Sequence, residues 1–323
     1  MHRAIRIHAP GGPDALTWEE VPSQPPGPGE VRIRHAAAGL NFIDVYHRTG
    51  LYPVPLPAVL GQEGAGRVVE VGPGVTSLKV NDRVAYAGLL GAYAEERVAP
   101  AERVVPLPPD ISEETAAAMM LKGMAAEYLL RRTFEVKPGT TILFHAAAGG
   151  VGLIACAWAK ALGATVIGTV GTEDKRELAR GAGCDHVLLT TSAQWPEEIR
   201  ALTHGRGVDV VYDGVGQATF AGSLEALRPR GTLVSFGQSS GKVPPLDVTL
   251  LSQKGSLFLT RPTLGHYTAT REELLASAYA LFGAVSSGAV RIDIRQRYAL
   301  RDAAKAHRDL EARKTTGSTV LLP

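Results

Sequence analysis

Cysteine is scarce in this sequence, because Cys156 and Cys184 are the only two among 323 residues. So few cysteines exclude the disulfide framework that holds many small secreted domains together. We expect both thiols to be reduced in a cytoplasmic protein. We interpret Cys156 as a small buried hydrophobic residue, since it follows a glycine-rich segment within a hydrophobic run.

A strong charge of one sign is also absent, since the formal net charge is +2. This balance gives no reason to expect nucleic acid or a membrane as the main partner. No hydrophobic run is long enough to span a membrane, and residues 1–7 resemble a strand rather than the hydrophobic core of a signal peptide. The hydrophobic fraction of 45% and the charged fraction of 20% are typical of a globular protein.

The most informative motif is the glycine-rich segment at 140–152. The hydrophobic run 142–144 predicts a strand, and the Ala-rich run 154–162 predicts a helix. The residues between them follow the pattern Ala147-x-Gly149-x-x-Gly152, in which alanine replaces the first glycine of the usual dinucleotide motif. Small residues let the backbone approach a pyrophosphate, and the helix start offers N–H groups and a positive dipole end. The pattern favours a nucleotide site over a glycine-rich turn that binds nothing.

The next strand bears on the identity of the nucleotide. Proteins that prefer NAD usually place Asp or Glu at its end, where the carboxylate binds the ribose 2′-hydroxyl. Here residues 168–171 (Gly-Thr-Val-Gly) occupy that end, and Lys175 and Arg176 follow. Glu173 and Asp174 add negative charge nearby, and Lys175 also fits as an ordinary solvated lysine. The pattern favours NADPH over NADH.

The chain divides into two kinds of pattern. Up to about residue 120, short alternating runs such as 31–35 and 66–71 are separated by Gly-Pro turns, as in a compact β barrel or sandwich. A helical segment is expected over 113–132. From residue 138 strands and helices alternate, which predicts a parallel sheet with helices on both faces. Strands are expected at 141–144, 165–170, 186–189, 208–213, 232–236 and 256–260, and helices at 150–162, 173–181, 217–228 and 271–287.

Taken together, several motifs resemble the zinc-independent medium-chain dehydrogenases/reductases, and within them the NADPH:quinone oxidoreductases that include zeta-crystallin. The resemblance covers essentially the whole chain. Its motifs lie at 39–44 (GLNFID), 50–53 (GLYP), 61–66 (GQEGAG), 121–123 (LKG), 146–152 (AAAGGVG), 235–241 (SFGQSSG), 260–262 (TRP), 314–318 (KTTGS) and 320–323 (VLLP).

The resemblance implies a GroES-like catalytic domain over residues 1–122, completed by about 265–323, whose last strand at 318–323 rejoins it. It implies a Rossmann domain over 123–264, with a cleft between the two domains. It further implies a homodimer joined through the Rossmann domains, and NADPH as the cofactor.

A catalytic metal is not expected. Zinc alcohol dehydrogenases hold Zn²⁺ with cysteine, histidine and a further ligand. Here 40–42 (Leu-Asn-Phe) stands where the first cysteine would lie, Gln62 replaces the histidine, and no cysteine precedes residue 156. A quinone or activated alkene is already electrophilic and accepts hydride without a Lewis acid.

For the substrate, the resemblance marks Asn41 and Tyr52 as catalytic. Asn41 would donate an amide hydrogen bond to a quinone oxygen or position the nicotinamide ribose, and Tyr52 would supply ring contact and a hydroxyl donor. Tyr46 and Arg261 would line the substrate pocket. From the residues alone, a turn residue is the favoured interpretation of Asn41 and a half-buried packing residue that of Tyr52; the resemblance reverses this order.

The resemblance also marks a set of cofactor residues. Gly149, Gly150, Val151 and Gly152 would hold the pyrophosphate, Gly171, Thr172 and Lys175 the adenosine phosphate, and Arg313 would add positive charge. Those near the ribose and nicotinamide would be Phe42, Tyr46, Tyr128, Val215, Phe236, Gly237, Gln238, Ser239, Ser240, Pro262 and Thr263.

Three departures from close relatives affect these expectations. Thr190 stands where a tyrosine is frequent beside the adenosine phosphate, Ala125 where a threonine is common, and Gln62 where many have a small residue. Two other functions stay open. One is reduction of α,β-unsaturated carbonyls, which needs a proton donor for the α-carbon. The other is a binding protein that keeps the cofactor site, with RNA or structural duties, against which the near-neutral charge argues.

Overall fold

The computed structural model describes residues 1–323 and divides into two compact units. Unit 1 comprises Met1–Met124, Thr268–Ser286 and Ile292–Pro323, and unit 2 comprises Ala125–Tyr267 and Ser287–Arg291. The division therefore falls two or three residues beyond the boundaries expected at 122/123 and 264/265. The short return of 287–291 to unit 2 was not expected. None of the helices is long and apolar enough to cross a membrane.

Unit 1 is built on antiparallel strands. A seven-stranded sheet runs in the order β15-β16-β3-β5-β6-β8, with β7 also paired to β3, and a three-stranded sheet runs β2-β1-β4. The strands are β1 (His2–Ile7), β2 (Thr17–Val21), β3 (Glu30–Leu40), β4 (Ala58–Val59), β5 (Glu63–Val71), β6 (Arg83–Ala87), β7 (Glu96–Pro100), β8 (Val105–Pro106), β15 (Ile294–Ala299) and β16 (Ser318–Leu322).

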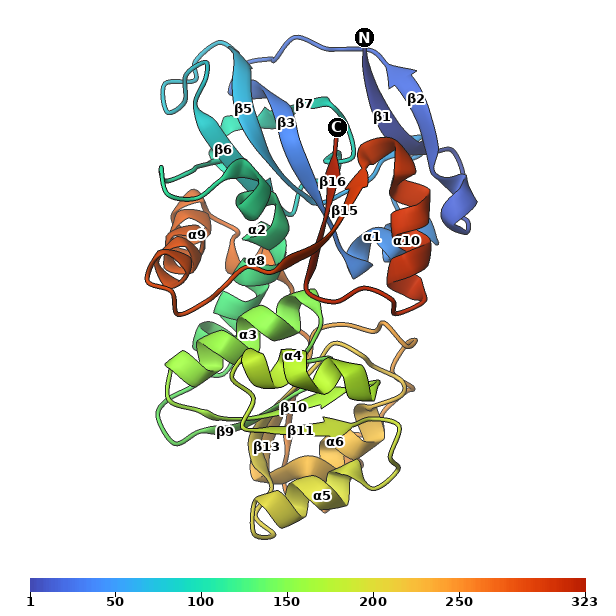
Figure 1. Cartoon of the computed structure of the whole chain (residues 1–323), viewed down its shortest axis with the longest axis vertical. Helices are drawn as coiled ribbons and strands as arrows, with labels where there is room; N and C mark the ends of the chain where they lie inside the picture. Colours follow the sequence, from blue (N-terminus) through green and yellow to red (C-terminus); the bar gives the residue numbers. More distant parts are fainter. The chain divides into compact units, whose positions relative to one another are not determined.

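The helices of unit 1 connect and cover these sheets (Figure 1). They are α1 (Phe42–Arg48), α2 (Glu113–Tyr128, which continues into unit 2), α9 (Arg271–Ser286) and α10 (Ala303–Glu311), with short 3₁₀ turns at Pro13–Ala15, Ala101–Arg103 and Leu300–Asp302. Along β3, buried and more exposed positions alternate at first, as a strand with one face on the core requires. The C-terminal strand β16 pairs antiparallel with β3, so the end of the chain completes unit 1 as expected.

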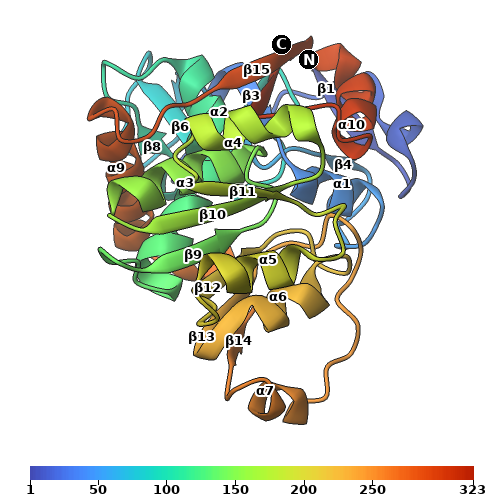
Figure 2. The same cartoon turned by 60° about the horizontal axis from the view of Figure 1, so that its bottom comes forward.

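Unit 2 holds a six-stranded parallel sheet in the order β11-β10-β9-β12-β13-β14. From β9 the chain adds β10 and β11 on one side of the sheet, then crosses back and adds β12, β13 and β14 on the other side. This strand order is the Rossmann arrangement, and it confirms the expected fold class. Figure 2 shows α3 and α4 on one face of the sheet and α5 and α6 on the other. Its strands are β9 (Thr141–Phe144), β10 (Thr165–Val170), β11 (His186–Leu189), β12 (Val208–Asp213), β13 (Leu227–Ser235) and β14 (Phe258–Thr260).

The helices of unit 2 differ in places from their expected bounds. They are α3 (Gly150–Ala161), α4 (Arg176–Gly181, after a 3₁₀ turn at Glu173–Lys175), α5 (Trp195–Leu202), α6 (Phe220–Ala226), α7 (Thr249–Gln253) and α8 (Leu264–Tyr267). The expected helix over 113–132 gives way after Tyr128 to a π-helical turn at Leu129–Thr133.

The helix expected over 217–228 is shorter, and the reason is a buried carboxylate. Asp213 Oδ1 accepts the N–H groups of Val215 and Gly216 and the Thr219 hydroxyl at 2.8–2.9 Å. These bonds hold the chain in a turn, so α6 begins only at Phe220. At its other end, Leu227 already belongs to β13. Strand pairing therefore places in β13 residues that the sequence pattern had assigned to the helix.

Candidate functional site

The first group of candidate residues lies at the start of α1, in unit 1. Asn41 precedes the helix with extended backbone angles, and its N–H donates to Asp44 Oδ2 at 2.9 Å. This bond satisfies one of the free backbone donors at a helix start. Asn41 itself is only 8% exposed, so the side chain is held in the protein with limited access to solvent.

The side-chain amide of Asn41 faces a buried ion pair. Its Nδ2 donates to Glu63 Oε1 at 2.8 Å and makes a longer bond of 3.4 Å to the Gly39 carbonyl. Glu63 is fully buried and also binds Lys122 Nζ and the Leu121 N–H. In this structure both amide hydrogens point at protein acceptors, and the catalytic role of Asn41 stays a prediction.

A second buried chain of polar groups lies behind Asp44. Tyr93 OH donates to Asp44 Oδ2 at 2.8 Å and lies 3.2 Å from His307 Nε2. His307 Nδ1 lies 3.0 Å from an Arg48 nitrogen, and Arg48 also forms a two-bond ion pair with Glu311 at 2.8 and 2.9 Å. Since the arginine only donates, His307 is neutral with its proton on Nε2.

Burial changes the acidity of two groups in this chain. It raises the pKa of Asp44 to about 7, against the bonds from Tyr93 and Asn41 that favour the carboxylate. Burial, together with the Arg48 charge, lowers the pKa of His307 to about 3. The other oxygen of Asp44, Oδ1, is buried and has no hydrogen-bond partner. Sequence reasoning missed this network, since its members are up to 263 residues apart.

Three of the predicted aromatic side chains gather at α1, the helix that Asn41 precedes. The Tyr46 ring lies 6.0 Å from Phe42 and 5.2 Å from Tyr52, edge-on to the latter. His47 supports the loop that carries Tyr52, since its Nδ1 lies 3.2 Å from the Tyr52 carbonyl. Gln62 Nε2 lies 2.6 Å from His47 Nε2, so the amide donates there and the other ring nitrogen carries the proton. Gln62 thus occupies the expected histidine position and orients a neighbouring imidazole.

The glycine-rich loop forms the second group, in unit 2. Gly149 precedes α3, and no side chain caps the first N–H groups of this helix, which belong to Gly150, Val151 and Gly152. A Cβ on Gly152 would lie 2.4 Å from the Ala146 carbonyl oxygen, so only glycine fits. The left-handed residue of the loop is Ala146, with φ of +53°. This explains why alanine is tolerated at position 147, which needs no positive φ.

The end of β10 carries no carboxylate, as the sequence indicated. A Cβ on Gly171 would meet nothing within 4 Å, and Thr172 begins the following turn with extended angles. Arg176 lies 3.0 Å from Glu173 Oε2 and also donates to the Val187 carbonyl. Arg176 is thereby engaged with the protein, and Glu173 is partly neutralised. Lys175 remains the candidate for a phosphate.

The loops after β12 and β13 lie against one another. The Val215 carbonyl accepts the N–H and the hydroxyl of Ser240, both at 2.8 Å. Phe236 lies with its ring 5.7 Å from Phe144 of β9. Gly237 packs against Gly214, because a Cβ on it would lie 2.5 Å from the Gly214 carbonyl oxygen. The structure therefore brings together the predicted residues at 215 and 236–240, at the carboxyl ends of their strands.

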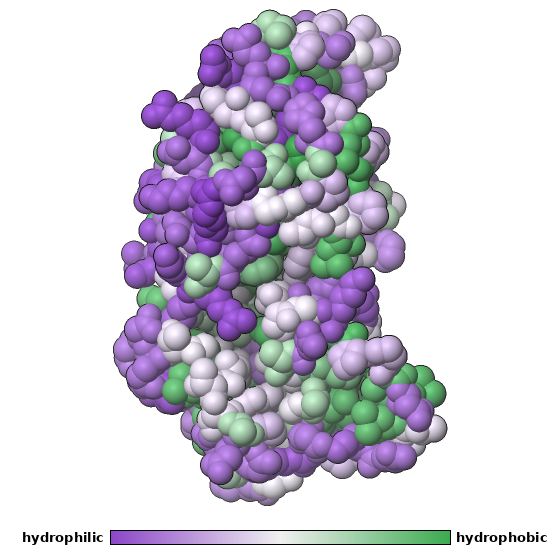
Figure 3. Space-filling model, turned by 90° about the vertical axis from the view of Figure 1, so that its right-hand side faces the viewer, coloured by the Kyte–Doolittle hydropathy of each residue, from purple (hydrophilic) through white to green (hydrophobic).

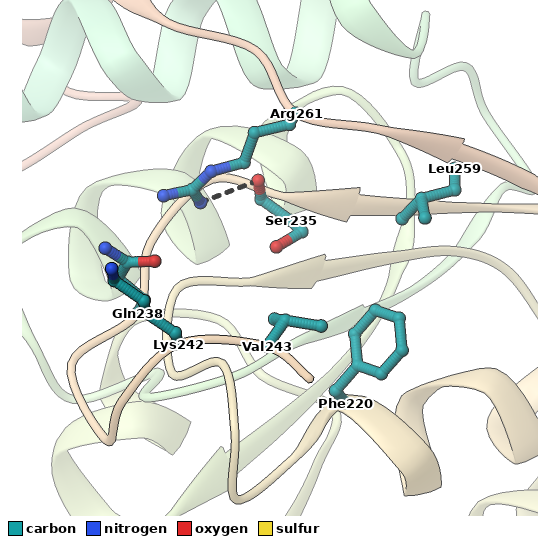
Figure 4. Close-up of a pocket in the computed structure, with 7 residues that line it drawn as sticks. All are labelled: Phe220, Ser235, Gln238, Lys242, Val243, Leu259 and Arg261. Carbon is teal, nitrogen blue, oxygen red and sulfur yellow. Dashed lines mark hydrogen bonds between the residues drawn. The ribbon is translucent and has the colours of Figure 1, made fainter. Parts of the chain in front are cut away.

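Beside this loop lies a cavity of about 300 Å³ (Figure 4). Arg261 extends over it and donates to the carbonyls of Ser235 and Gly237, at 2.8 and 3.1 Å. The expected substrate-pocket arginine thus holds the backbone of the loop that follows β13. The cavity is lined by Phe220, Ser235, Gln238, Lys242, Val243, Leu259 and Arg261.

The remaining predicted residues are spread over both units. Tyr128 is buried and stacks on Tyr267 at 4.6 Å, and burial raises its pKa above the usual range. Pro262 and Thr263 lie in the loop after β14. Arg313 belongs to unit 1, follows α10 and has a left-handed φ of +58°. No cluster of three His, Cys, Asp or Glu residues is placed to hold a metal ion.

Comparison with known families matches both halves of this architecture. Residues 27–109 match the alcohol dehydrogenase GroES-like domain, and residues 150–276 match the family described as zinc-binding dehydrogenase. The chain is 54% identical over 325 residues to a quinone oxidoreductase of Pseudomonas aeruginosa, covering 100% of both. It is 48% identical over 332 residues to a 2-haloacrylate reductase of Burkholderia sp, covering 100% of this chain and 99% of that one.

Solved structures agree with the sequence relatives. The quinone oxidoreductase of Escherichia coli, solved in complex with NADPH, superposes with a TM-score of 0.97 at 48% identity. The alignment covers 99% of this chain and 100% of that chain.

Proposed function

Because the chain belongs to the quinone oxidoreductase family of the medium-chain dehydrogenases/reductases, we propose that it uses NADPH to reduce quinones by direct hydride transfer without a metal. The observation that carries this proposal is the start of α1. There, Asn41 precedes a helix on which three aromatic rings gather, and Gln62 replaces the histidine a zinc site would need. Flat aromatic surfaces suit a flat, uncharged substrate.

The residues of unit 2 fit the diphosphate of a dinucleotide. The backbone around Gly152 leaves no space for a side chain, and the N–H groups at the start of α3 have no protein cap. Such a helix start stabilises a phosphate by its free donors and its dipole. Bound there, NADPH supplies the hydride of the reaction.

The end of β10 supports a preference for the 2′-phosphate. No carboxylate stands there to bind a ribose hydroxyl or repel a phosphate, and the ion pair of Glu173 with Arg176 reduces the negative charge nearby. Lys175 and Thr172 would then hold the phosphate, with Arg313 as a further cation. The Thr190 hydroxyl is tied to the Val170 carbonyl at 3.3 Å, so it does not replace the tyrosine common at this position.

In unit 1 the residues orient the acceptor and supply its proton. The aromatic rings of Phe42, Tyr46 and Tyr52 contact a flat substrate, and the Tyr52 hydroxyl is the proposed proton donor to the quinone oxygen. His47, oriented by Gln62, fixes the backbone at Tyr52. We expect Tyr52→Phe to lower kcat with an ortho-quinone about 100-fold or more, the scale of lost general acid catalysis, with little change in NADPH affinity.

A second candidate function is reduction of activated alkenes. It is favoured by the 48% identity to a 2-haloacrylate reductase over the full chain. NADPH oxidation is measured with an ortho-quinone and with an enone. Fast turnover with the quinone supports the proposal, turnover with the enone alone assigns the alkene reaction, and tight NADPH binding without turnover indicates a binding protein.

We also propose a homodimer formed through unit 2. Strand β14 lies at the edge of the parallel sheet and pairs only with β13, so its other side has unpaired backbone groups. Phe258 on this strand is 61% exposed, and Val248 before α7 is 73% exposed. Figure 3 shows one face of the molecule, largely hydrophilic, with hydrophobic surface gathered at its lower right. Exposed hydrophobic side chains beside an open strand edge are typical of a subunit interface.

A further inference from the structure

We infer that Asp213 is a positioning residue for the nicotinamide half of the cofactor, because it fixes both loops that are predicted to lie near that half. This inference rests on the proposed function, since it concerns the same cofactor site. Asp213 is the last residue of β12 and is fully buried. It therefore acts through the backbone around it and not by contact with the ligand.

The side chain of Asp213 fixes the loop after β12. Its Oδ1 accepts the Val215 N–H at 2.8 Å and the Gly216 N–H at 2.9 Å. These bonds hold the turn in which Gly216 has a left-handed φ of +89°. Backbone groups that are bonded within the protein need little reordering when a ligand binds beside them.

The backbone of Asp213 fixes the loop after β13. Its carbonyl oxygen accepts the N–H groups of Phe236 and Gly237, at 2.9 and 3.3 Å. The two loops follow neighbouring parallel strands, β12 and β13, and sheets of this kind bind their ligands beyond the carboxyl ends of such strands. One aspartate thus holds both loops in register with each other.

Two hydroxyl groups hold the carboxyl of Asp213 from its other side. Thr219 Oγ1 donates to it and lies 2.8 Å from Oδ2, and the Ser223 hydroxyl lies 3.0 Å from the same oxygen. Ser223 is fully buried and Thr219 is 2% exposed, so water does not compete for these bonds. The orientation of the carboxyl is therefore fixed by protein donors alone.

His145, which follows β9, orients Ser223. Its Nε2 lies 3.0 Å from Ser223 Oγ, and its Nδ1 lies 2.8 Å from Thr169 Oγ1. The hydroxyl hydrogen of Ser223 is used on Asp213 or on the Thr219 carbonyl, both acceptors, so Nε2 must carry a proton and donate to Ser223. Burial lowers the pKa of His145, so the ring is neutral and Nδ1 accepts the Thr169 hydroxyl.

This arrangement predicts what two variants of Asp213 would do. Asp213→Ala removes the acceptor of the Val215 and Gly216 N–H groups, so the loop after β12 would have to be ordered when the cofactor binds. Asp213→Asn keeps an oxygen for these two N–H groups. The hydroxyls of Thr219 and Ser223 can turn to accept hydrogen bonds from the new NH₂ group.

The test compares the dissociation constants of NADPH and of adenosine 2′,5′-bisphosphate, which lacks the nicotinamide half. We expect Asp213→Ala to weaken NADPH binding about tenfold, the scale of fixing the backbone of one residue, and to change bisphosphate binding less than about twofold. We expect Asp213→Asn to recover most of the NADPH affinity. Asp213→Asn that binds NADPH as weakly as Asp213→Ala would contradict the role given to Oδ1.

Asp209 provides a matched control at the other end of β12. It is 6% exposed, and its carboxyl accepts the Thr141 N–H at 2.8 Å and a bond from Arg228 at 2.6 Å. Asp209→Ala should lower the free energy of unfolding, measured in urea, without changing the ratio of the two dissociation constants. An equal change of this ratio in Asp209→Ala would show that the effect of Asp213 is only structural.

An unchanged ratio in folded Asp213→Ala would overturn the inference. Should Asp213→Ala not fold, Ser223→Ala decides, since it removes one donor to the carboxyl and leaves the His145 Nε2–H without its acceptor. A selective loss of NADPH affinity in this variant supports the inference, and an unchanged ratio overturns it. Failure of the wild-type protein to oxidise NADPH with a quinone would instead contradict the proposed function, whatever these affinities are.

Discussion

At the scale of single residues, Asp44 is the least expected feature of the site. It is fully buried, one of its oxygens has no partner, and its pKa is raised to about 7 because burial disfavours the charge. In an unfolded chain the same group titrates near 3.8. The folded protein therefore holds this proton more tightly than the unfolded chain does. By linkage, the stability that Asp44 contributes is present below its unfolded pKa and is lost as the pH rises towards 7.

We predict that Asp44→Asn removes this loss, because the variant keeps an acceptor for Tyr93 and Asn41 without an ionising group. The free energy of unfolding of the wild-type protein relative to the variant should fall by about 3 kcal/mol between pH 5 and pH 8. Urea unfolding at both pH values measures this difference in the free energy of unfolding.

The low pKa of His307 acts in the opposite direction, because its stabilising effect is lost as the pH falls from 6.5 towards 3. It is present in both proteins, so a pH-independent difference between them would contradict the assignment to Asp44.

At the scale of residues, the sequence indicated some of the site residues and gave no indication of others. Asn41 and Tyr52 were predicted because their motifs resemble a known family, and the glycines were predicted because a strand and a helix flank them. His307 gave no signal, and Lys122 was noted only within the 121–123 motif without a role, since their partners Tyr93 and Glu63 are 214 and 59 residues away. The direction of the Asn41 amide depends on Glu63, 22 residues away, so local sequence did not indicate it.

At the scale of elements, the parallel sheet was the most predictable part. Hydrophobic runs matched β9, β10, β11 and β12 to the residue, because strands covered on both faces must be hydrophobic throughout. The helix predicted over 217–228 was too long. The bonds to Asp213 and the pairing of β13 shorten it, and these are tertiary contacts that the local pattern does not indicate.

A further prediction concerns the glycine-rich loop between β9 and α3. Gly152→Ala should destabilise the protein by about 2 kcal/mol, because the new Cβ would press on the backbone of Ala146 and Ala147. It should also weaken NADPH binding, since the loop must move to relieve the contact. Chemical unfolding and fluorescence titration measure the two effects. Gly181→Ala in α4 is the control, because a Cβ there meets nothing within 4 Å. Equal stability of the two variants would contradict the close approach.

At the scale of the whole molecule, the exposed edge of the parallel sheet predicts self-association. Sedimentation at micromolar concentration should give a dimer for the wild-type protein. Phe258→Lys should shift it to monomers, since a charge at a hydrophobic interface is costly to bury. Val80→Lys is a matched control, because Val80 is 50% exposed in unit 1, outside the proposed interface. A monomeric wild-type protein, or a dimer unaffected by Phe258→Lys, would contradict this interface.

The central claim is hydride transfer from NADPH to a quinone without a metal. Its most direct test is rapid mixing of NADPH-loaded protein, treated with a chelator and checked by elemental analysis, with an ortho-quinone. We predict complete oxidation of bound NADPH at zinc far below one ion per chain, slower when the transferred hydrogen is deuterium, and weaker activity with NADH. Activity that disappears with the metal and returns with added zinc would contradict the account.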